Sequence, residues 1–155
     1  MVLIKSISGI RGTVGGKVKD GLNPLDIVRF TSGYAKWIKK QGFQSKTIII
    51  GRDARISGSM LNGVVCSTLN AYGLDVIDVG LSTTPTVEVA VQIEKAAGGI
   101  ILTASHNPIE WNALKLLNNQ GEFLSESDGK EVLGYAEMGD FYYEDIRNLG
   151  TYLYD

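Results

Sequence analysis

Apolar residues along the chain alternate between short runs and longer amphipathic stretches, and this alternation predicts strands and helices in turn. The short runs are typical of buried strands; they lie at residues 2–7, 46–50, 74–79, 98–102 and 113–117. Between them, apolar positions recur at three- and four-residue spacing, which indicates helices with one buried face. These helical stretches lie at residues 24–41, 58–72, 85–91 and 126–136.

We therefore predict a three-layer α/β/α sandwich with a mixed, mostly parallel sheet, because strands that alternate with helices pair in parallel through right-handed crossovers. The turn sequence NNQG at residues 118–121 leads to a short strand at 122–124, which we expect to be antiparallel. The domain is expected to cover residues 1–140. Residues 141–155, which are rich in tyrosine and acidic side chains, form a C-terminal tail in this prediction.

Polar residues and glycines mark the expected helix ends and loops. Asn23, Ser57, Thr84 and Ser125 each precede a helical stretch and are predicted N-caps. Residues 8–16 contain glycines at positions 9, 12, 15 and 16. We predict a loop there, since glycine allows positive φ and a close approach to a ligand.

The most distinctive polar segment is TASHNP at residues 103–108, directly after the buried strand at 98–102. Ligands of open α/β sheets bind outside the carboxyl ends of strands, so a hydroxyl, an imidazole and an amide here indicate a functional site. Ser105 and His106 are not expected to form a nucleophile and base, since neighbours on an extended segment point to opposite faces. A turn built from Ser, Asn and Pro for structural reasons alone is the alternative that these residues leave open.

Arginines stand near two other predicted strand ends. Arg11 lies in the glycine-rich segment, and its guanidinium offers a planar donor fork suited to phosphate oxygens. Arg52, Asp53 and Arg55 follow the second predicted strand. They form either a surface ion-pair cluster, which contributes little to stability, or the floor of a cleft in which Arg52 and Asp53 orient the Ser105 loop. Because loops after parallel strands open at one edge of a sheet, we expect Arg11, Arg52 and Ser105 near one another.

Composition excludes several classes of function. The chain has 155 residues and a formal net charge of -2, which gives no electrostatic case for binding nucleic acid or an anionic membrane. Cys66 is the only cysteine, so we expect a small buried side chain rather than a disulfide or a cysteine-based metal site. The N-terminal residues lack a stretch long enough for a signal peptide or a spanning helix, and we expect a cytoplasmic protein.

Three segments in the same order resemble the α-D-phosphohexomutases: SGIRG at 8–12, GRDARISG at 51–58, and TASHNP at 103–108 followed by NALK at 112–115. This family comprises phosphoglucomutase, phosphomannomutase and phosphoglucosamine mutase. The resemblance implies an enzyme that interconverts hexose 1-phosphate and hexose 6-phosphate. In such an enzyme, Ser105 would carry a phosphoryl group and exchange it with the sugar through a hexose 1,6-bisphosphate. Mg²⁺ would bind the phosphate of Ser105.

The same resemblance assigns roles residue by residue. The expected catalytic residues are Ser105, His106, Lys115 and Arg11. Residues expected to bind substrate or phosphate, or to orient the loop, are Arg52, Asp53, Asn107 and Asn112. The chain departs from the family in two places: SISG at 6–9 precedes Arg11 where the family has FGTDG, and Ala113 stands where the family usually has glycine.

The resemblance covers the first of the four domains of a phosphohexomutase. The expected partners are therefore a phosphosugar and the missing C-terminal domains of the same enzyme, not nucleic acid or a membrane, and residues 141–155 begin a linker. The family's magnesium loop, DGDxDR, has no counterpart in this sequence, so we expect the isolated domain to be inactive. A phosphoglucosamine mutase, or a non-catalytic module that binds phosphorylated sugars, is the alternative.

Overall fold

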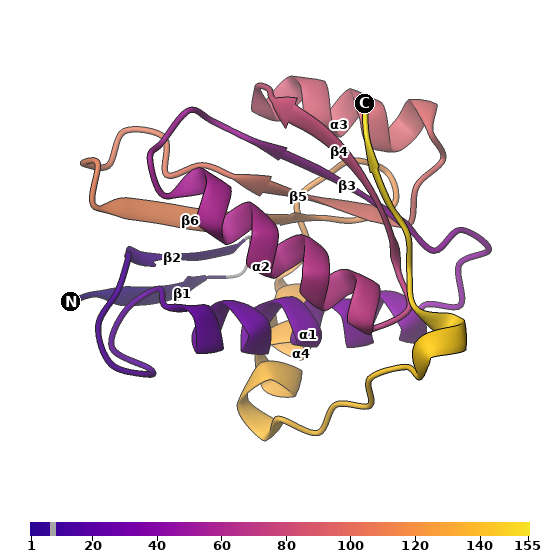
Figure 1. The fold of residues 1–155 in the computed structure, drawn as a ribbon, viewed down its shortest axis with the longest axis horizontal. Coiled ribbons are helices and arrows are strands. Elements are labelled where there is room, and N and C mark those ends of the chain that lie inside the picture. Colours follow the sequence, from indigo (N-terminus) through magenta and orange to yellow (C-terminus); the bar gives the residue numbers. More distant parts are fainter. Residues whose placement is uncertain (7–8) are drawn as a thin grey trace.

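One sheet organises the chain, and it is mixed. The computed structural model describes residues 1–6 and 9–155, so the predicted strand and loop residues Ile7 and Ser8 lie outside the described part. The strands run in the order β1-β2-β6-β5-β3-β4-β7 across the sheet (Figure 1). Their bounds are β1 (Leu3–Ser6), β2 (Gly9–Thr13), β3 (Thr47–Arg52), β4 (Asp75–Leu81), β5 (Gly98–Leu102), β6 (Trp111–Leu117) and β7 (Tyr152–Tyr154).

Parallel and antiparallel pairs occupy different halves of the sheet. β3 pairs in parallel with β4 and β5, and β4 pairs in parallel with β7. β5 with β6, β6 with β2, and β2 with β1 are antiparallel. The predicted mixed sheet is confirmed, but parallel pairs are not the majority, because the chain returns directly from β5 into β6 without a crossover helix. The predicted strand at 122–124 is reduced to one antiparallel bridge between Leu117 and Phe123.

Helices cover the two faces unequally, which completes the predicted α/β/α layering. One face packs against α1 (Pro24–Lys40) and α2 (Gly58–Ala71), and α4 (Glu126–Met138) packs against α1 in the same apolar cluster. The other face packs against α3 (Thr84–Ile93), whose Val87 and Val91 contact the apolar side chains of β3 and β5 (Figure 1). α3 has its main contacts with β3 and β5 and meets β6 at Leu117, the last residue of that strand, which leaves the β2 side of this face open. That open area is where the polar cluster described below lies.

The prediction of a loop over residues 8–16 is wrong for residues 9–13, which form β2. The reason lies in two of the glycines. A Cβ at Gly9 would meet the carbonyl oxygen of Leu114 at 2.3 Å, and a Cβ at Gly12 would meet that of Val2 at 2.6 Å. These glycines therefore allow neighbouring strands to approach, whereas Gly15 and Gly16 have the positive φ values, 110° and 85°, expected of a loop.

Two predicted helix caps are confirmed and two are wrong. The side chains of Asn23 and Ser125 accept hydrogen bonds from backbone N–H groups in the first turns of α1 and α4. Thr83, one residue before the predicted Thr84, caps α3. Ser57 does not cap α2; its hydroxyl instead accepts a hydrogen bond from the buried side chain of Asn112 at 2.8 Å.

The C-terminal tail packs on the sheet. After the short 3-10 helix Ile146–Asn148, β7 adds to the outer edge of β4. The hydroxyl of Tyr152 donates a hydrogen bond of 2.6 Å to the buried carboxylate of Asp78, which also accepts from the Asn62 side chain at 3.0 Å. The hydrogen bond to Asp78 raises the pKa of Tyr152 to about 12, because ionisation would place two negative charges together.

A buried tyrosine ties α1 to the centre of the sheet. The Tyr34 hydroxyl donates to the Leu117 carbonyl at 2.6 Å and accepts from the Gly99 N–H at 3.0 Å. Tyr34 is fully buried, which raises the pKa of its hydroxyl. A Cβ at Gly98 would meet this hydroxyl at 2.1 Å, so glycine is required beside it. The hydroxyl thereby fixes α1 against the β5–β6 pair.

We predict that Tyr34→Phe lowers the free energy of unfolding by about 1–3 kcal/mol, because it leaves buried backbone groups of Gly99 and Leu117 without their partner. The exposed Tyr142 provides the control: Tyr142→Phe is expected to change stability by less than about 0.5 kcal/mol. Urea unfolding monitored by circular dichroism measures both. Equal stabilities of the two variants would show that the Tyr34 hydroxyl does not support the sheet.

A second prediction concerns the pH dependence of the β7 contact. Since the pKa of Tyr152 rises from 10.0 to about 12 on folding, the stabilisation is complete below pH 10 and is lost between pH 10 and about 12. Titration of ¹³C-labelled tyrosine by NMR should show Tyr152 ionising near pH 12, and Asp78→Asn should move this pKa toward 10.0. An unchanged Tyr152 titration in Asp78→Asn contradicts the assignment of the shift to Asp78.

Candidate active site

The loop between β5 and β6 presents Ser105 at the edge of the sheet. Every residue of β5 is buried, and the chain leaves it at Thr103. Ser105 has φ 54°, a left-handed conformation that non-glycine residues rarely adopt. Its N–H donates to the Thr103 hydroxyl at 3.2 Å, and the Asn107 N–H donates to the Ala104 carbonyl at 3.0 Å. The result is a tight turn in which Ser105 and His106 are exposed.

Lys115 contacts the hydroxyl of this serine. It lies in β6, where it pairs with Ile101 of β5 and with Gly9 of β2. Its ammonium donates a hydrogen bond of 2.8 Å to Ser105 Oγ. A seven-residue strand that runs back antiparallel to β5 therefore brings the cation to the loop that β5 presents.

Arg11 and His106 complete a small cavity around the serine. The cavity has a volume of ≈ 250 Å³ and is lined by Arg11, Ala104, Ser105, His106, Asn107 and Lys115. These lining residues include two cations and no carboxylate, so the cavity favours an anion. Arg11 lies in β2, opposite Ala113, and its guanidinium stacks 5.8 Å from the ring centre of Trp111. The predicted proximity of Arg11 and Ser105 is thus present in the structure.

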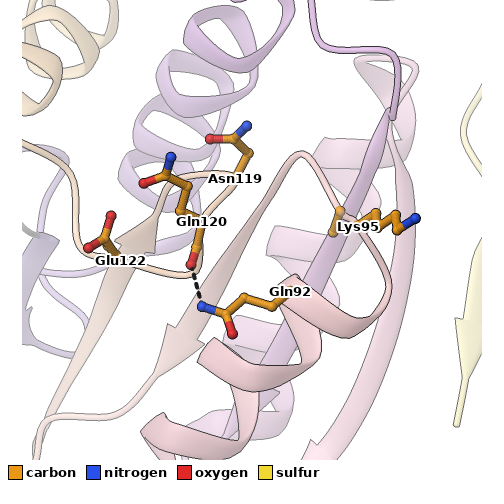
Figure 2. A pocket seen from close by; sticks show the side chains of 6 residues that line it. Gln92, Lys95, Asn119, Gln120 and Glu122 are labelled. Atoms are coloured by element: carbon orange, nitrogen blue, oxygen red, sulfur yellow. Dashed lines mark hydrogen bonds between the residues drawn. The ribbon is translucent and has the colours of Figure 1, made fainter.

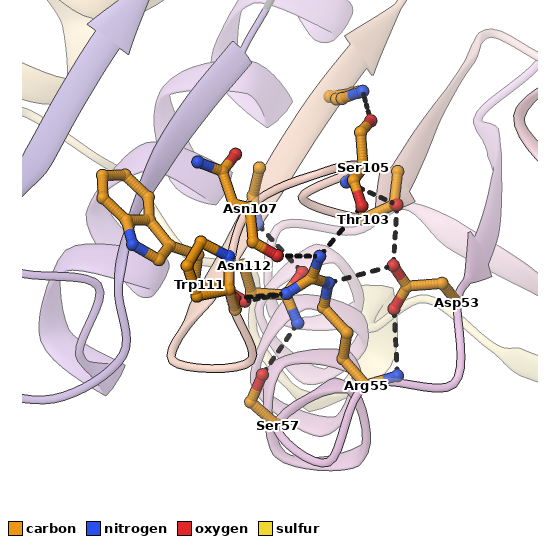
Figure 3. A network of polar contacts seen from close by, with 11 residues as sticks. Asp53, Arg55, Ser57, Thr103, Ser105, Asn107, Trp111 and Asn112 are labelled. Atoms are coloured by element: carbon orange, nitrogen blue, oxygen red, sulfur yellow. Dashed lines mark hydrogen bonds and ion pairs between the residues drawn. The ribbon is translucent and has the colours of Figure 1, made fainter.

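Beneath the loop, Arg55 and Asp53 form the network shown in Figure 3. The Arg55 guanidinium donates to the carbonyls of Ser105 and Asn107 at 3.0 and 2.7 Å, and it also bonds the carbonyls of Pro108 and Trp111. Asp53 accepts from the Arg55 guanidinium at 3.3 Å and from the Thr103 hydroxyl at 2.7 Å. This network links the loop after β3 to the loop after β5.

The other predicted site residues lie around this network in different ways. Asn112 is fully buried and bonds Ser57, which ties the start of β6 to α2. Asn107 lines the serine cavity and contributes its carbonyl to Arg55. The Arg52 side chain packs beside Gly58, and among the described residues no hydrogen bond joins it to the Ser105 loop.

Sequence reasoning did not single out Arg55 or Thr103 as site residues. Arg55 stands beside Arg52 and Asp53 in the sequence, and no local pattern distinguishes which of the two arginines reaches a loop 50 residues away. The feature that could have pointed to Arg55 is the set of backbone carbonyls in the Ser105 loop that require hydrogen-bond donors. Its turn exposes several carbonyls that no strand or helix satisfies, and such groups require a multidentate donor.

A second cavity, of ≈ 580 Å³, lies at the other ends of β5 and β6, away from the Ser105 loop, and is a poor candidate site. Figure 2 shows its lining side chains, Gln92, Lys95, Asn119, Gln120 and Glu122, which do not converge on one point. Gln92 instead donates to the backbone carbonyl of Gln120 at 2.9 Å. The serine cavity is smaller, but two cations line it, and one of them, Lys115, is hydrogen-bonded to the serine hydroxyl.

The described residues offer neither a preformed metal site nor a membrane span. In residues 1–6 and 9–155, no three His, Cys, Asp or Glu side chains gather closely enough to hold a metal ion. None of the helices described there combines the length and the apolar character needed to cross a bilayer.

Comparison with known proteins identifies the fold and its family. The family model for phosphoglucomutase/phosphomannomutase, alpha/beta/alpha domain I, matches residues 3–143. A phosphoglucomutase/phosphomannomutase from Thermococcus kodakarensis is 38% identical over 148 residues, which cover 87% of this chain and 32% of the relative. A phosphoglucosamine mutase from Natranaerobius thermophilus is 34% identical over 124 residues, which cover 80% of this chain and 27% of the relative.

A solved structure shows the same fold. The phosphoglucomutase/phosphomannomutase family protein from Burkholderia thailandensis superposes with a TM-score of 0.76 at 22% identity, over 97% of this chain and 33% of that protein. The chain thus spans about a third of the length of these proteins. Together with the serine, lysine and arginine around one cavity, the match over residues 3–143 shows that the chain belongs to the phosphoglucomutase/phosphomannomutase family as its α/β/α domain I.

Proposed function

We propose that this chain is the catalytic-serine domain of a phosphohexomutase and that Ser105 carries the phosphoryl group. The observation that carries the proposal is the 2.8 Å hydrogen bond from the Lys115 ammonium to Ser105 Oγ, inside a cavity that Arg11 also lines. A phosphoserine bears about -1.5 to -2 charges at neutral pH, and the two cations oppose that charge. The substrate class is a hexose 1-phosphate or 6-phosphate.

The chemistry follows from where the cations lie. In the first step, a sugar hydroxyl attacks the phosphorus of phospho-Ser105, and the bond between phosphorus and Ser105 Oγ breaks as the new phosphorus–oxygen bond forms. The sugar hydroxyl gives up its proton, and Ser105 Oγ takes one up to become a hydroxyl. Negative charge develops on Ser105 Oγ, and the Lys115 ammonium is hydrogen-bonded to that atom in the unphosphorylated protein. Arg11 and His106 border the same cavity and would hold phosphoryl oxygens in this proposal. In the second step, Ser105 Oγ attacks the other phosphorus of the resulting hexose 1,6-bisphosphate, and the bond between that phosphorus and the sugar oxygen breaks. The serine hydroxyl gives up its proton, and the sugar oxygen takes one up to become a hydroxyl.

Membership of the family is the only support in this proposal for a role of Mg²⁺. The described side chains do not form a magnesium site by themselves, since no three acidic or imidazole groups gather there. The phosphate on Ser105 would supply one oxygen ligand, and the remaining ligands would come from outside this domain. When bound, the ion would neutralise charge on the transferring phosphoryl group.

The substrate sugar stays open within this proposal. Relatives of similar identity are named as a phosphoglucomutase/phosphomannomutase and as a phosphoglucosamine mutase. The chain spans about a third of their length, so sugar-binding residues, activity and the further domains are properties of a longer protein in this account. Residues 1–140 would then form the phosphoserine domain, and residues 141–155 would lead toward the next one.

We predict that Ser105→Ala, made in the complete gene product that contains this chain, lowers mutase turnover by at least about 10³-fold, because no phosphoryl carrier is left. Turnover is measured with glucose, mannose and glucosamine 1-phosphates in the presence of the matching bisphosphate and Mg²⁺. The matched control is Ser127→Ala, an exposed serine in α4, which should retain wild-type turnover. Appreciable activity of Ser105→Ala contradicts the proposal and favours a non-catalytic phosphosugar-binding module.

A further inference from the structure

The backbone of the Ser105 loop is held by one side chain from another loop. The Arg55 guanidinium donates to four carbonyls: those of Ser105 at 3.0 Å, Asn107 at 2.7 Å, Pro108 at 2.6 Å and Trp111 at 3.2 Å. These carbonyls span the loop from the serine to the first residue of β6. Figure 3 shows Arg55 beneath the loop, with the Ser105 side chain extending away from it.

Arg55 is itself fixed in place. Its side chain is 13% exposed, and Asp53 accepts hydrogen bonds from both its guanidinium, at 3.3 Å, and its backbone N–H, at 3.1 Å. The same carboxylate accepts from the Thr103 hydroxyl, which in turn accepts from the Ser105 N–H. Both peptide groups of Ser105 are therefore connected to the Asp53–Arg55 pair, one through Thr103 and the other directly.

This connection accounts for the unusual backbone at Ser105. A residue with a Cβ at φ 54° is disfavoured and persists only where its surroundings hold it. Without Arg55, the Ser105 carbonyl would lose its partner, and the peptide group could turn. The hydroxyl would then leave the position in which it meets Lys115.

The same contacts determine which polar groups face the serine hydroxyl. In a trans peptide, the C=O and the following N–H point in opposite directions. Because the Ser105 carbonyl points to Arg55, the N–H of the same peptide group, that of His106, points away from Arg55. The Ser105 side chain also extends away from Arg55 (Figure 3). An N–H on that side attracts phosphoryl oxygens, whereas a carbonyl there would repel them.

We propose that Arg55 is the positioning residue of the Ser105 loop: it draws four backbone carbonyls away from the serine hydroxyl and thereby keeps Ser105 Oγ aligned with Lys115. This inference rests on the proposed phosphoryl transfer for its catalytic consequence, since that reaction depends on alignment. A lysine at position 55 would keep the charge but lose the planar fork that reaches several carbonyls at once.

The experiment compares Arg55→Lys with a matched control, Arg29→Lys. Arg29 lies in α1, its side chain is 17% exposed, and it pairs with Asp26 at 2.8 Å, so the control also removes one partly buried guanidinium–carboxylate pair. In the 155-residue chain, NMR chemical shifts should show Ser105 leaving the left-handed region in Arg55→Lys. Amide exchange over residues 103–111 should become faster in that variant and not in Arg29→Lys. Arg55→Gln serves as the second variant if Arg55→Lys does not fold.

The kinetic comparison uses the complete gene product that contains this chain. For Arg55→Lys we expect kcat to fall about 10- to 100-fold while KM changes by less than about threefold, because the loss is one of alignment rather than of sugar binding. Arg29→Lys should keep the wild-type kcat. Thermal unfolding of both variants separates this effect from a general loss of stability.

Each outcome decides the inference. Wild-type loop geometry and wild-type kcat in Arg55→Lys overturn it. The inference is also overturned if both variants lose kcat in proportion to the fall in their unfolding temperatures. Arg55 would then support only the fold. A third outcome is that the wild-type enzyme has no mutase activity, but Arg55→Lys still changes the backbone geometry of the Ser105 loop. This result would refute the proposed function and leave the positioning role of Arg55 intact.

Discussion

The antiparallel return from β5 into β6 is the constraint on which the site depends. β3 and β5 run in parallel and end at one edge of the sheet, where their following loops meet. Because β6 pairs antiparallel with β5, a residue only ten positions after Ser105 comes back beside it, and that residue is Lys115. Tyr34 supports this pair from α1 through the backbone of Gly99 and Leu117. The core and the site are therefore linked through the same two strands.

Charge is distributed unequally on the two sides of the Ser105 loop. Beneath it, Arg55 and Asp53 neutralise each other and satisfy the backbone. Above it, Arg11 and Lys115 line the cavity without a carboxylate among the described lining residues. The open area of the sheet beside α3 lets these two side chains reach the serine from β2 and β6. A loop held from below by a neutral pair and faced from above by cations is suited to carry a phosphoryl group.

Much of this arrangement follows from sequence patterns, and the failures have physical causes. Buried strands and amphipathic helices are local signals, and they predicted the α/β/α layers. β2 was missed because its glycines permit close strand pairing, which depends on the carbonyls of the nearby Val2 and of Leu114, far along the chain. The prediction that Ser57 caps α2 was wrong because its hydroxyl accepts a hydrogen bond from the Asn112 side chain instead. Motifs pointed to Ser105, Lys115 and Arg11, but choosing Arg55 over Arg52 required knowing which guanidinium faces the loop carbonyls.

The most direct test of the account is to map phosphorylation in the complete gene product after incubation with glucose 1,6-bisphosphate and Mg²⁺. Intact mass and peptide mapping should show one added phosphoryl group, located on Ser105, and its removal on addition of a hexose phosphate. The Lys115 ammonium and Arg11 would then surround a phosphate rather than a free hydroxyl. A folded protein that gains no phosphoryl group, or gains it on another residue, would contradict the assignment of Ser105 as the carrier.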